Sequence, residues 1–183
     1  MDKSVSRISL LMEGYPRIGF QVYSRILESG WDGVCITRLH PEYVQQKHGL
    51  NNTECFWLSG RKGKGTISPK TLSQLVKVVR TEAKGKDGAL VFLDGLEYLL
   101  MYNDITKVMD ALKEIDRNLA RSNGEMIICI DPLTLEKRDV ERLWECYEKY
   151  DAAEAESVFT QQFQQISSAV PRSEGQKAEG LVG

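Results

Sequence analysis

Residues Ala89 to Asp94 read A-L-V-F-L-D, an apolar run that ends in an acid. A run that is apolar at every position is typical of a central parallel strand covered on both faces. Four other short apolar runs, at 7–12, 33–37, 55–58 and 126–130, are each followed by a segment with helical spacing of apolar residues. We therefore predict a three-layer α/β domain whose sheet is mainly parallel and has about five strands, with a helix at its C-terminal end.

The composition of the chain is that of an ordinary globular protein. It has 183 residues, 42% of them hydrophobic and 27% charged, and its 24 Lys and Arg against 26 Asp and Glu give a net charge of −2. This balance argues against nucleic-acid binding through net positive charge. No apolar run approaches the ~20 residues that a membrane span needs, and the N-terminus lacks the cleavage site of a signal peptide. We expect a cytoplasmic protein whose four cysteines are free thiols.

The domain is expected to span residues 1–150 and to end in a helix that carries Trp144 and Tyr147. Residues 151–166 are rich in Ala and Gln, which favour a helical extension. Residues 167–183 are rich in Ser, Pro, Gly and charge, which is typical of a disordered tail.

A glycine turn joins the first predicted strand to the first predicted helix. Gly14 to Gln21 read G-Y-P-R-I-G-F-Q, and Gly14 and Gly19 have the spacing of the phosphate-binding P-loop, G-x-x-x-x-G-K-[ST]. Phe20 stands where the lysine would reach the phosphates, and Gln21 where the hydroxyl would bind magnesium. Pro16 removes one backbone N–H from the loop. We predict no nucleotide hydrolysis and no cofactor; binding without hydrolysis is the alternative.

Polar residues are expected at the carboxyl ends of the strands, where parallel sheets bind ligands. Thr37-Arg38, Asp94 and Asp131 fall at that edge, and we predict that Arg38 pairs with Asp94 or with Asp131. Asp94 and Glu97 also match a capping box, in which Asp94 begins a helix and Glu97 reaches back to it. A metal or catalytic role for these two acids is the lesser alternative.

Two further segments carry local signals. Ser68-Pro69 has the pattern of a helix start, with a capping hydroxyl followed by proline at the first helical position, and Asn103-Asp104 can cap the next helix. The loop with Arg61, Lys62 and Lys64 is expected to be a solvated connection, with binding of a phosphate or of a nucleic-acid backbone as the alternative.

Several short motifs occur together in one order. They are Ile36-Thr37-Arg38, Phe56-Trp57-Leu58-Ser59, Ile67-Ser68-Pro69, Leu93-Asp94-Gly95-Leu96-Glu97-Tyr98-Leu99 and Ile130-Asp131-Pro132. With them, the segment from about Ile8 to Tyr147 resembles the mainly archaeal domain-of-unknown-function family 835. Members often sit beside sensory domains such as PAS modules and histidine kinases, so the resemblance implies a signalling role without an established reaction. More remotely, the glycine turn and the acid-ended strand are similar to RecA- and KaiC-like ATPases with a degenerate P-loop.

We therefore expect a non-catalytic signalling or scaffold module that acts through protein–protein contact. The contact would use the carboxyl edge at Arg38, Asp94, Glu97 and Asp131, or the aromatic face near Trp144, where the C-terminal helix could also form a homodimer. The rival hypothesis is a nucleotide- or phosphate-responsive regulator without ATPase activity, and the third is an enzyme with unrecognised chemistry.

Overall fold

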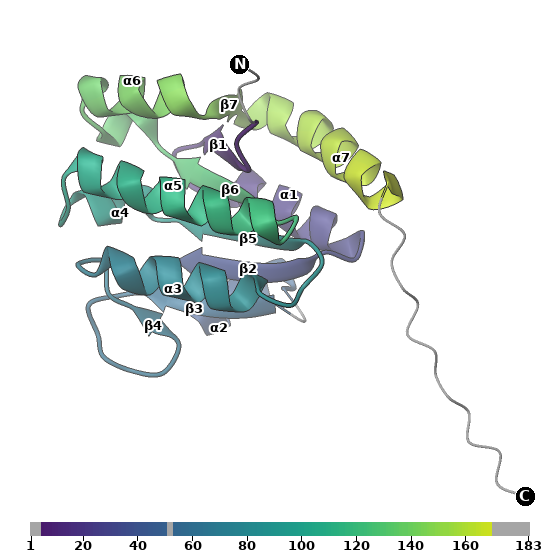
Figure 1. Cartoon of the computed structure of the whole chain (residues 1–183), viewed down its shortest axis with the longest axis horizontal. Helices are drawn as coiled ribbons and strands as arrows, with labels where there is room; N and C mark the ends of the chain where they lie inside the picture. The colour runs from purple at the N-terminus through teal and green to yellow at the C-terminus, as the bar shows by residue number, and fades with distance from the viewer. Residues whose placement is uncertain (1–4, 51–52, 170–183) are drawn as a thin grey trace, which may run out of the picture.

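All strands among the described residues lie in one parallel sheet. The computed structural model describes residues 5–50 and 53–169, and its seven strands follow the order β4-β3-β2-β5-β6-β1-β7 (Figure 1). The strands are β1 (Ile8–Met12), β2 (Asp32–Thr37), β3 (Thr53–Leu58), β4 (Thr66–Ile67), β5 (Ala89–Asp94), β6 (Glu125–Ile130) and β7 (Glu148–Asp151). Each neighbouring pair is parallel, so the predicted α/β class is confirmed.

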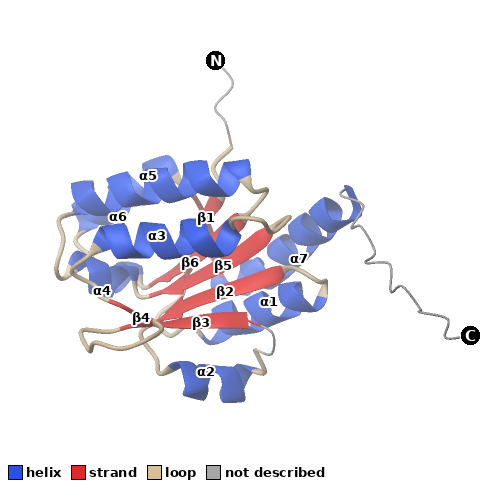
Figure 2. Cartoon of the chain, turned by 60° about the horizontal axis from the view of Figure 1, so that its bottom comes forward, coloured by secondary structure: helices blue, strands red, loops and turns tan. Residues whose placement is uncertain are grey.

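Helices cover both faces of the sheet. One face carries α3 (Leu72–Ala83), α4 (Leu96–Leu100), α5 (Ile105–Arg121) and α6 (Lys137–Cys146). The other carries α1 (Arg17–Glu28), α2 (Pro41–His48) and α7 (Ala152–Ala169), with α7 packed along α1 (Figure 2). β5 is buried at every position because it lies near the middle of the sheet, as its unbroken apolar pattern predicts.

The two strands that the sequence does not predict are the edge strands. β4 has only two residues, and β7 reads E-K-Y-D, with no apolar alternation. An edge strand that pairs on one side can be polar, so its sequence resembles that of a loop. β7 also separates α6 from α7: Trp144 lies on α6, the buried Tyr147 directly follows its last residue, and Tyr150 lies on β7.

Of the two helix-start predictions, one is confirmed and one is wrong. The Asp104 carboxylate accepts a hydrogen bond from Lys107 N at 3.0 Å and caps α5. By contrast, α3 begins at Leu72 rather than at Pro69. The Ser68 hydroxyl accepts only from Lys70 N, at 3.3 Å, in a local turn.

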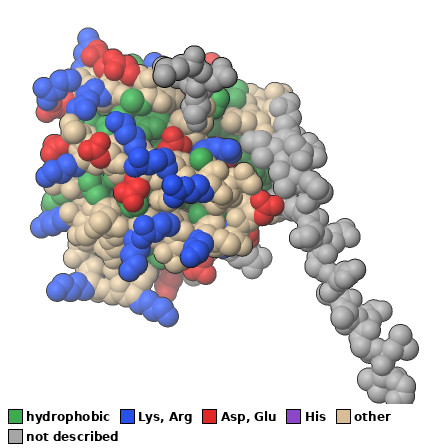
Figure 3. Space-filling model, viewed as in Figure 1, with side chains coloured by type: hydrophobic (Ala, Val, Ile, Leu, Met, Phe, Trp, Pro, Cys, Tyr) green, Lys and Arg blue, Asp and Glu red, His purple; other side chains and the backbone are tan. Residues whose placement is uncertain are grey.

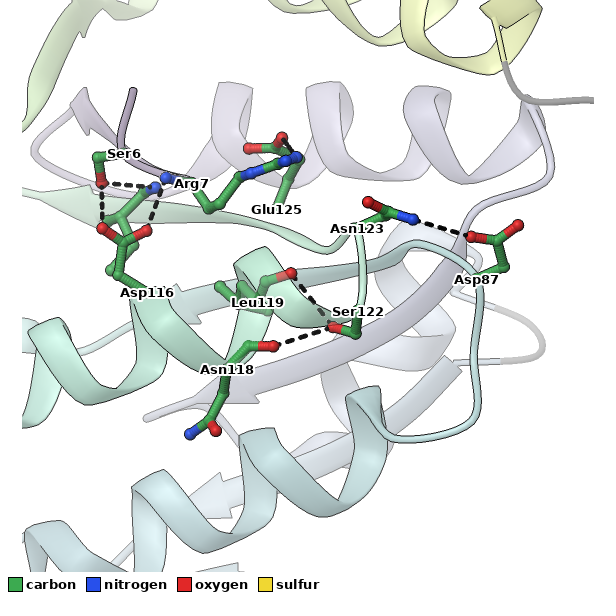
Figure 4. Close-up of polar contacts among 10 residues, drawn as sticks. Ser6, Arg7, Asp87, Asp116, Asn118, Leu119, Ser122, Asn123 and Glu125 are labelled. Atoms are coloured by element: carbon green, nitrogen blue, oxygen red, sulfur yellow. Dashed lines mark hydrogen bonds and ion pairs between the residues drawn. The ribbon is translucent and has the colours of Figure 1, made fainter. Parts of the chain in front are cut away.

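The amino ends of β1 and β6 are tied to α5 by a polar cluster (Figure 4). Arg7 Nη1 lies 2.9 Å from Glu125 Oε1, and the Asp116 carboxylate accepts from Arg7 N at 2.7 Å and from the Ser6 hydroxyl at 3.1 Å. Glu125 is only 8% exposed, so this ion pair holds a largely buried carboxylate at the start of a central strand.

Within the described ranges no helix has both the length and the apolar character needed to cross a membrane. Residues 152–169 form α7, a separate helix that follows β7, so the segment 151–166 is helical from residue 152 but does not extend α6. Of the tail predicted at 167–183, the first three residues are the end of this helix, and 170–183 lie outside the described residues.

Candidate functional site

The glycine turn holds a carboxylate where a P-loop would hold a phosphate. Glu13, the residue after β1, accepts hydrogen bonds from Ile18 N at 2.7 Å and from Gly19 N at 2.9 Å, one on each carboxylate oxygen. These N–H groups belong to the first turn of α1, where helix N–H groups lack partners inside the helix and attract anions. The chain therefore supplies its own anion to this helix.

The other N–H groups of the first turn are also paired. Arg17 N donates to Tyr15 O at 2.7 Å, and Phe20 N donates to Pro16 O at 3.2 Å. A phosphate placed here would meet the Glu13 charge and no free N–H in this turn.

The residues at the P-loop positions have structural roles. A Cβ at Gly19 would lie 2.3 Å from Cys129 Sγ, so only glycine fits between α1 and the sheet. Phe20 is fully buried, stacked on His48 with ring centroids 4.4 Å apart and packed on Phe92 at 4.8 Å. Gln21 is exposed. The aromatic ring at the lysine position is thus part of the core.

Arg38 and Asp94 form an ion pair at the carboxyl edge. Arg38 Nη2 lies 3.0 Å from Asp94 Oδ1, and the Thr37 hydroxyl donates to Asp94 Oδ2 at 3.1 Å. Asp94 is 2% exposed, so its two oxygens are engaged inside the protein. The prediction that Arg38 pairs with Asp94 or Asp131 is confirmed for Asp94, because β2 and β5 are direct neighbours.

The capping-box prediction is wrong. α4 begins after Gly95, which has φ +133° and makes no side-chain cap, and Asp94 turns back to Arg38 instead. Glu97 Oε1 accepts from Asp131 N at 2.6 Å, which joins α4 to the end of β6. Burial raises the pKa of Glu97, and its Oε2 atom is buried without a hydrogen-bond partner in the described chain.

Asp131 is placed close to the glycine turn. Its Oδ1 accepts from Leu133 N at 3.0 Å and caps the short helix η1 (Pro132–Thr134), while its Oδ2 lies 3.6 Å from the position of a Cβ on Gly14. The structure thus brings Glu13, Asp94, Glu97 and Asp131 to one edge. Among the described residues, no three His, Cys, Asp or Glu side chains are arranged to hold a metal ion.

Exposed apolar and aromatic side chains lie around these acids. The largest exposures are Leu133 at 92% and Met101 at 74%, with Tyr15 and Tyr102 near half exposed. Trp57 adds its indole, which donates to Arg38 O at 3.1 Å. We call Tyr15, Arg38, Trp57, Met101, Tyr102 and Leu133 the carboxyl-edge surface. Tyr15, Arg38 and Leu133 follow β1, β2 and β6, Trp57 is the next-to-last residue of β3, and Met101 and Tyr102 follow α4, the short helix after β5.

Cations of the chain stack on several of these rings. Arg61 lies 5.6 Å from the centroid of Trp57, and Lys70 lies 5.2 Å from that of Tyr102. Arg61, Lys62 and Lys64 of the basic loop are all exposed, and Arg61 also contacts the carboxyl-edge surface through Trp57.

Trp144 belongs to a different part of the molecule. It lines a groove of about 1020 Å³ together with Val5 and Ser6, which precede β1, and with residues of β7. The ammonium of Lys149 lies 3.6 Å from the centroid of its ring, and 38% of the residue is exposed. The structure therefore does not join Trp144 to the edge that carries Arg38 and Asp94.

Sequence reasoning missed the role of Glu13. The sequence signal for this role is an acidic residue directly before the glycine turn. Glu13 lies five residues before Ile18, whose backbone N–H donates to it. Helix first turns need an acceptor, and an acid placed just before one is a candidate for it.

The fold and the glycine turn define a class: a parallel α/β domain in which a carboxylate of the chain fills the anion site of the first helix. The model of the family described as "Protein of unknown function (DUF835)" matches residues 17–145, and the chain belongs to this family. The resemblance seen in the sequence motifs is thereby confirmed. A comparison with curated proteins gives no significant match.

Proposed function

We propose that this chain is a non-catalytic regulatory or scaffold module that binds another protein through its carboxyl-edge surface. The observation that carries the proposal is the position of Glu13, whose carboxylate accepts from Ile18 N and Gly19 N. The feature that would bind a phosphate in this fold is used to close the turn, so the first turn of α1 offers no free anion site.

The acids of the edge have the same kind of role. Asp94 is held by Arg38 and Thr37, and Glu97 joins α4 to Asp131. Asp94, with its two oxygens engaged by the Thr37 hydroxyl and the Arg38 guanidinium, is poorly placed to transfer a proton or to bind a metal. This supports a surface that recognises rather than reacts.

The side chains exposed at this edge are of the types that dominate protein–protein contacts. Tyr, Trp, Met and Arg are enriched in interface cores, and Leu133, which is 92% exposed, adds apolar area to them. The face formed by α3, α5 and α6 is different: in Figure 3, Lys and Arg lie among Asp and Glu, and hydrophobic side chains show only between them. Such a mixed charged face is typical of a solvated surface.

The aromatic face at Trp144 is the weaker candidate for the contact. Lys149 covers its indole ring at 3.6 Å, closer than Arg61 lies to Trp57 (5.6 Å) or Lys70 to Tyr102 (5.2 Å) at the carboxyl edge, so a partner would have to displace a tighter cation–π contact. We therefore assign the contact to the carboxyl edge, with signalling proteins of the cytoplasm as the expected partners.

The test is chemical crosslinking followed by affinity capture from the native cell extract, with three forms of the full chain as bait. Leu133→Glu alters the edge, and Val5→Glu is the matched control, because Val5 is 78% exposed but precedes the opposite end of β1. We expect one or more partners to be captured by the wild-type chain and by Val5→Glu, and to be lost with Leu133→Glu. Equal capture by all three forms would remove the proposed surface.

A second experiment addresses the nucleotide-responsive alternative. Thermal unfolding is measured with ATP, GTP and cyclic nucleotides, each with and without magnesium. We expect no specific shift of Tm. A stabilisation of the wild-type chain by several degrees with one nucleotide would replace the proposed function by the alternative.

A further inference from the structure

Two cysteines face each other across neighbouring strands. Cys35 of β2 is the direct register partner of Cys55 of β3, and both side chains pack on the face covered by α1 and α2. Neighbouring strands lie about 4.8 Å apart. A disulfide needs a Cα separation of about 4.4–6.8 Å, so this pair can be joined without moving the strands apart.

The two thiols differ in reactivity. Cys35 is fully buried, and its pKa is raised by the hydrogen bond with Cys55 and by burial. The pKa of Cys55 is lowered because the Cys35 thiol hydrogen-bonds to its sulfur, although partial burial opposes this effect. Cys55 is also partly exposed to solvent. An oxidant therefore reaches Cys55 first, and Cys55 is the better nucleophile of the pair.

We propose that Cys35 and Cys55 are a thiol–disulfide pair that hydroperoxides oxidise. The Cys55 thiolate attacks one oxygen of the hydroperoxide, the O–O bond breaks, and the leaving oxygen takes a proton to become water or an alcohol. Cys55 is then a sulfenic acid. The Cys35 sulfur attacks the Cys55 sulfur, the S–O bond breaks, and the Cys35 proton leaves with the hydroxide as water. Two thiols are oxidised to one disulfide, and one hydroperoxide is reduced.

The other two cysteines do not fit this chemistry. Cys129 is buried on β6 and is separated from β2 by β5, and Cys146 is exposed on α6, on the opposite face of the sheet from Cys35 and Cys55. Neither is a register partner of another cysteine. The pairing of Cys35 with Cys55 is thus specific to the β2–β3 register, and it does not depend on the proposed function.

The test uses the full chain carrying Cys146→Ser, which removes the exposed thiol. The reduced protein is treated with hydrogen peroxide at neutral pH, and remaining thiols are blocked by alkylation. We expect an intact mass, taken before alkylation, that is lower by two hydrogen atoms, and a disulfide between the tryptic peptides 26–38 and 48–61, which hold Cys35 and Cys55. Dithiothreitol should restore both alkylation sites. Full alkylation of Cys35 and Cys55 after prolonged peroxide treatment would overturn the proposal.

Two variants test the order of the steps. In Cys35→Ser the sulfenic acid has no resolving thiol, so dimedone should label Cys55. In Cys55→Ser, Cys35 should stay reduced at the same peroxide concentration. Labelling of Cys35 but not Cys55 in these variants would refute the assigned roles, and the peptide mapping of the parent chain needs neither variant to fold.

Discussion

The Oε2 atom of Glu13 lies 2.9 Å from the backbone nitrogen of Gly19, so a side chain of the protein occupies the place where a P-loop takes a phosphate oxygen. The first helix of the fold is thereby satisfied without a ligand. The consequence is measurable, because removing the carboxylate both destabilises the helix and empties an anion site.

Replacing Glu13 by Ala should lower the free energy of unfolding by about 1–2 kcal/mol, because Ile18 N and Gly19 N lose their acceptors at the positive end of α1. Urea denaturation measures the loss. Glu13→Gln keeps an acceptor oxygen without the charge and should lose less. Equal stability of Glu13→Ala and the wild-type chain would mean that water replaces the carboxylate without cost.

The emptied site should also bind an anion. Millimolar inorganic phosphate is expected to raise the Tm of Glu13→Ala more than that of the wild-type chain or of Glu13→Gln. The comparison between forms removes the general stabilisation that phosphate gives to most proteins. The same increment in all three forms would show that the turn does not select anions.

The two glycines of the turn should differ sharply in their tolerance of a methyl group. Gly19→Ala places a Cβ 2.3 Å from Cys129 Sγ and should cost more than about 2 kcal/mol, because the core between α1 and β6 must expand. Gly14→Ala meets its nearest atom, Asp131 Oδ2, at 3.6 Å and should be tolerated. Chemical denaturation of both variants gives the comparison. Cys129→Ala should restore part of the stability of Gly19→Ala.

The Arg38–Asp94 pair is expected to be energetically coupled. Arg38→Ala leaves the carboxylate of Asp94, which is 2% exposed, without its cation. The free energy of unfolding should fall by about 1–3 kcal/mol, and the lower part of this range applies if solvent screens the partly exposed guanidinium. When Arg38→Ala is made in a chain that already carries Asp94→Asn, the free energy of unfolding should fall by clearly less. A double-mutant cycle by urea denaturation measures the difference. Additive costs would show that the pair contributes no interaction energy of its own.

The pairing of Arg38 shows which part of the site the sequence predicts and which part it does not. The apolar runs predict parallel strands, and parallel strands bring Arg38, Asp94 and Asp131 to one edge. The choice between the two acids depends on strand order: β5 lies next to β2, and β6 lies one strand further away. Strand order arises from the packing of the whole sheet and has no local signal.

Local patterns failed where tertiary contacts outweigh them. Asp94 and Glu97 have capping-box spacing, but Gly95 turns the chain at φ +133° and Asp94 binds Arg38 across the sheet. β7 carries no apolar pattern because a single neighbour, β1, pairs with it. In both cases the decisive partner is distant in the sequence.

Stability should fall as pH rises from about 4.5 to 7, through the ionisation of Glu125. Burial raises the pKa of this carboxyl to about 7, and the ion pair with Arg7 offsets only part of that effect. Because the folded chain binds the proton more tightly than the unfolded chain, the stabilisation is complete below the unfolded pKa and is lost as pH rises through 7.

Glu125→Gln removes this ionisation and provides the measurement. Urea denaturation of both chains at several pH values gives their free energies of unfolding. The difference should change in favour of the variant as pH rises, by up to about 3 kcal/mol between pH 4.5 and 8. Other titrating groups are shared by the two chains and cancel in the difference. Arg7→Met should extend the loss to higher pH, because the cation that lowers the pKa of Glu125 is gone. A variant that instead loses stability relative to the wild-type chain over this range would mean that the ion pair of Figure 4 outweighs the burial of the carboxylate.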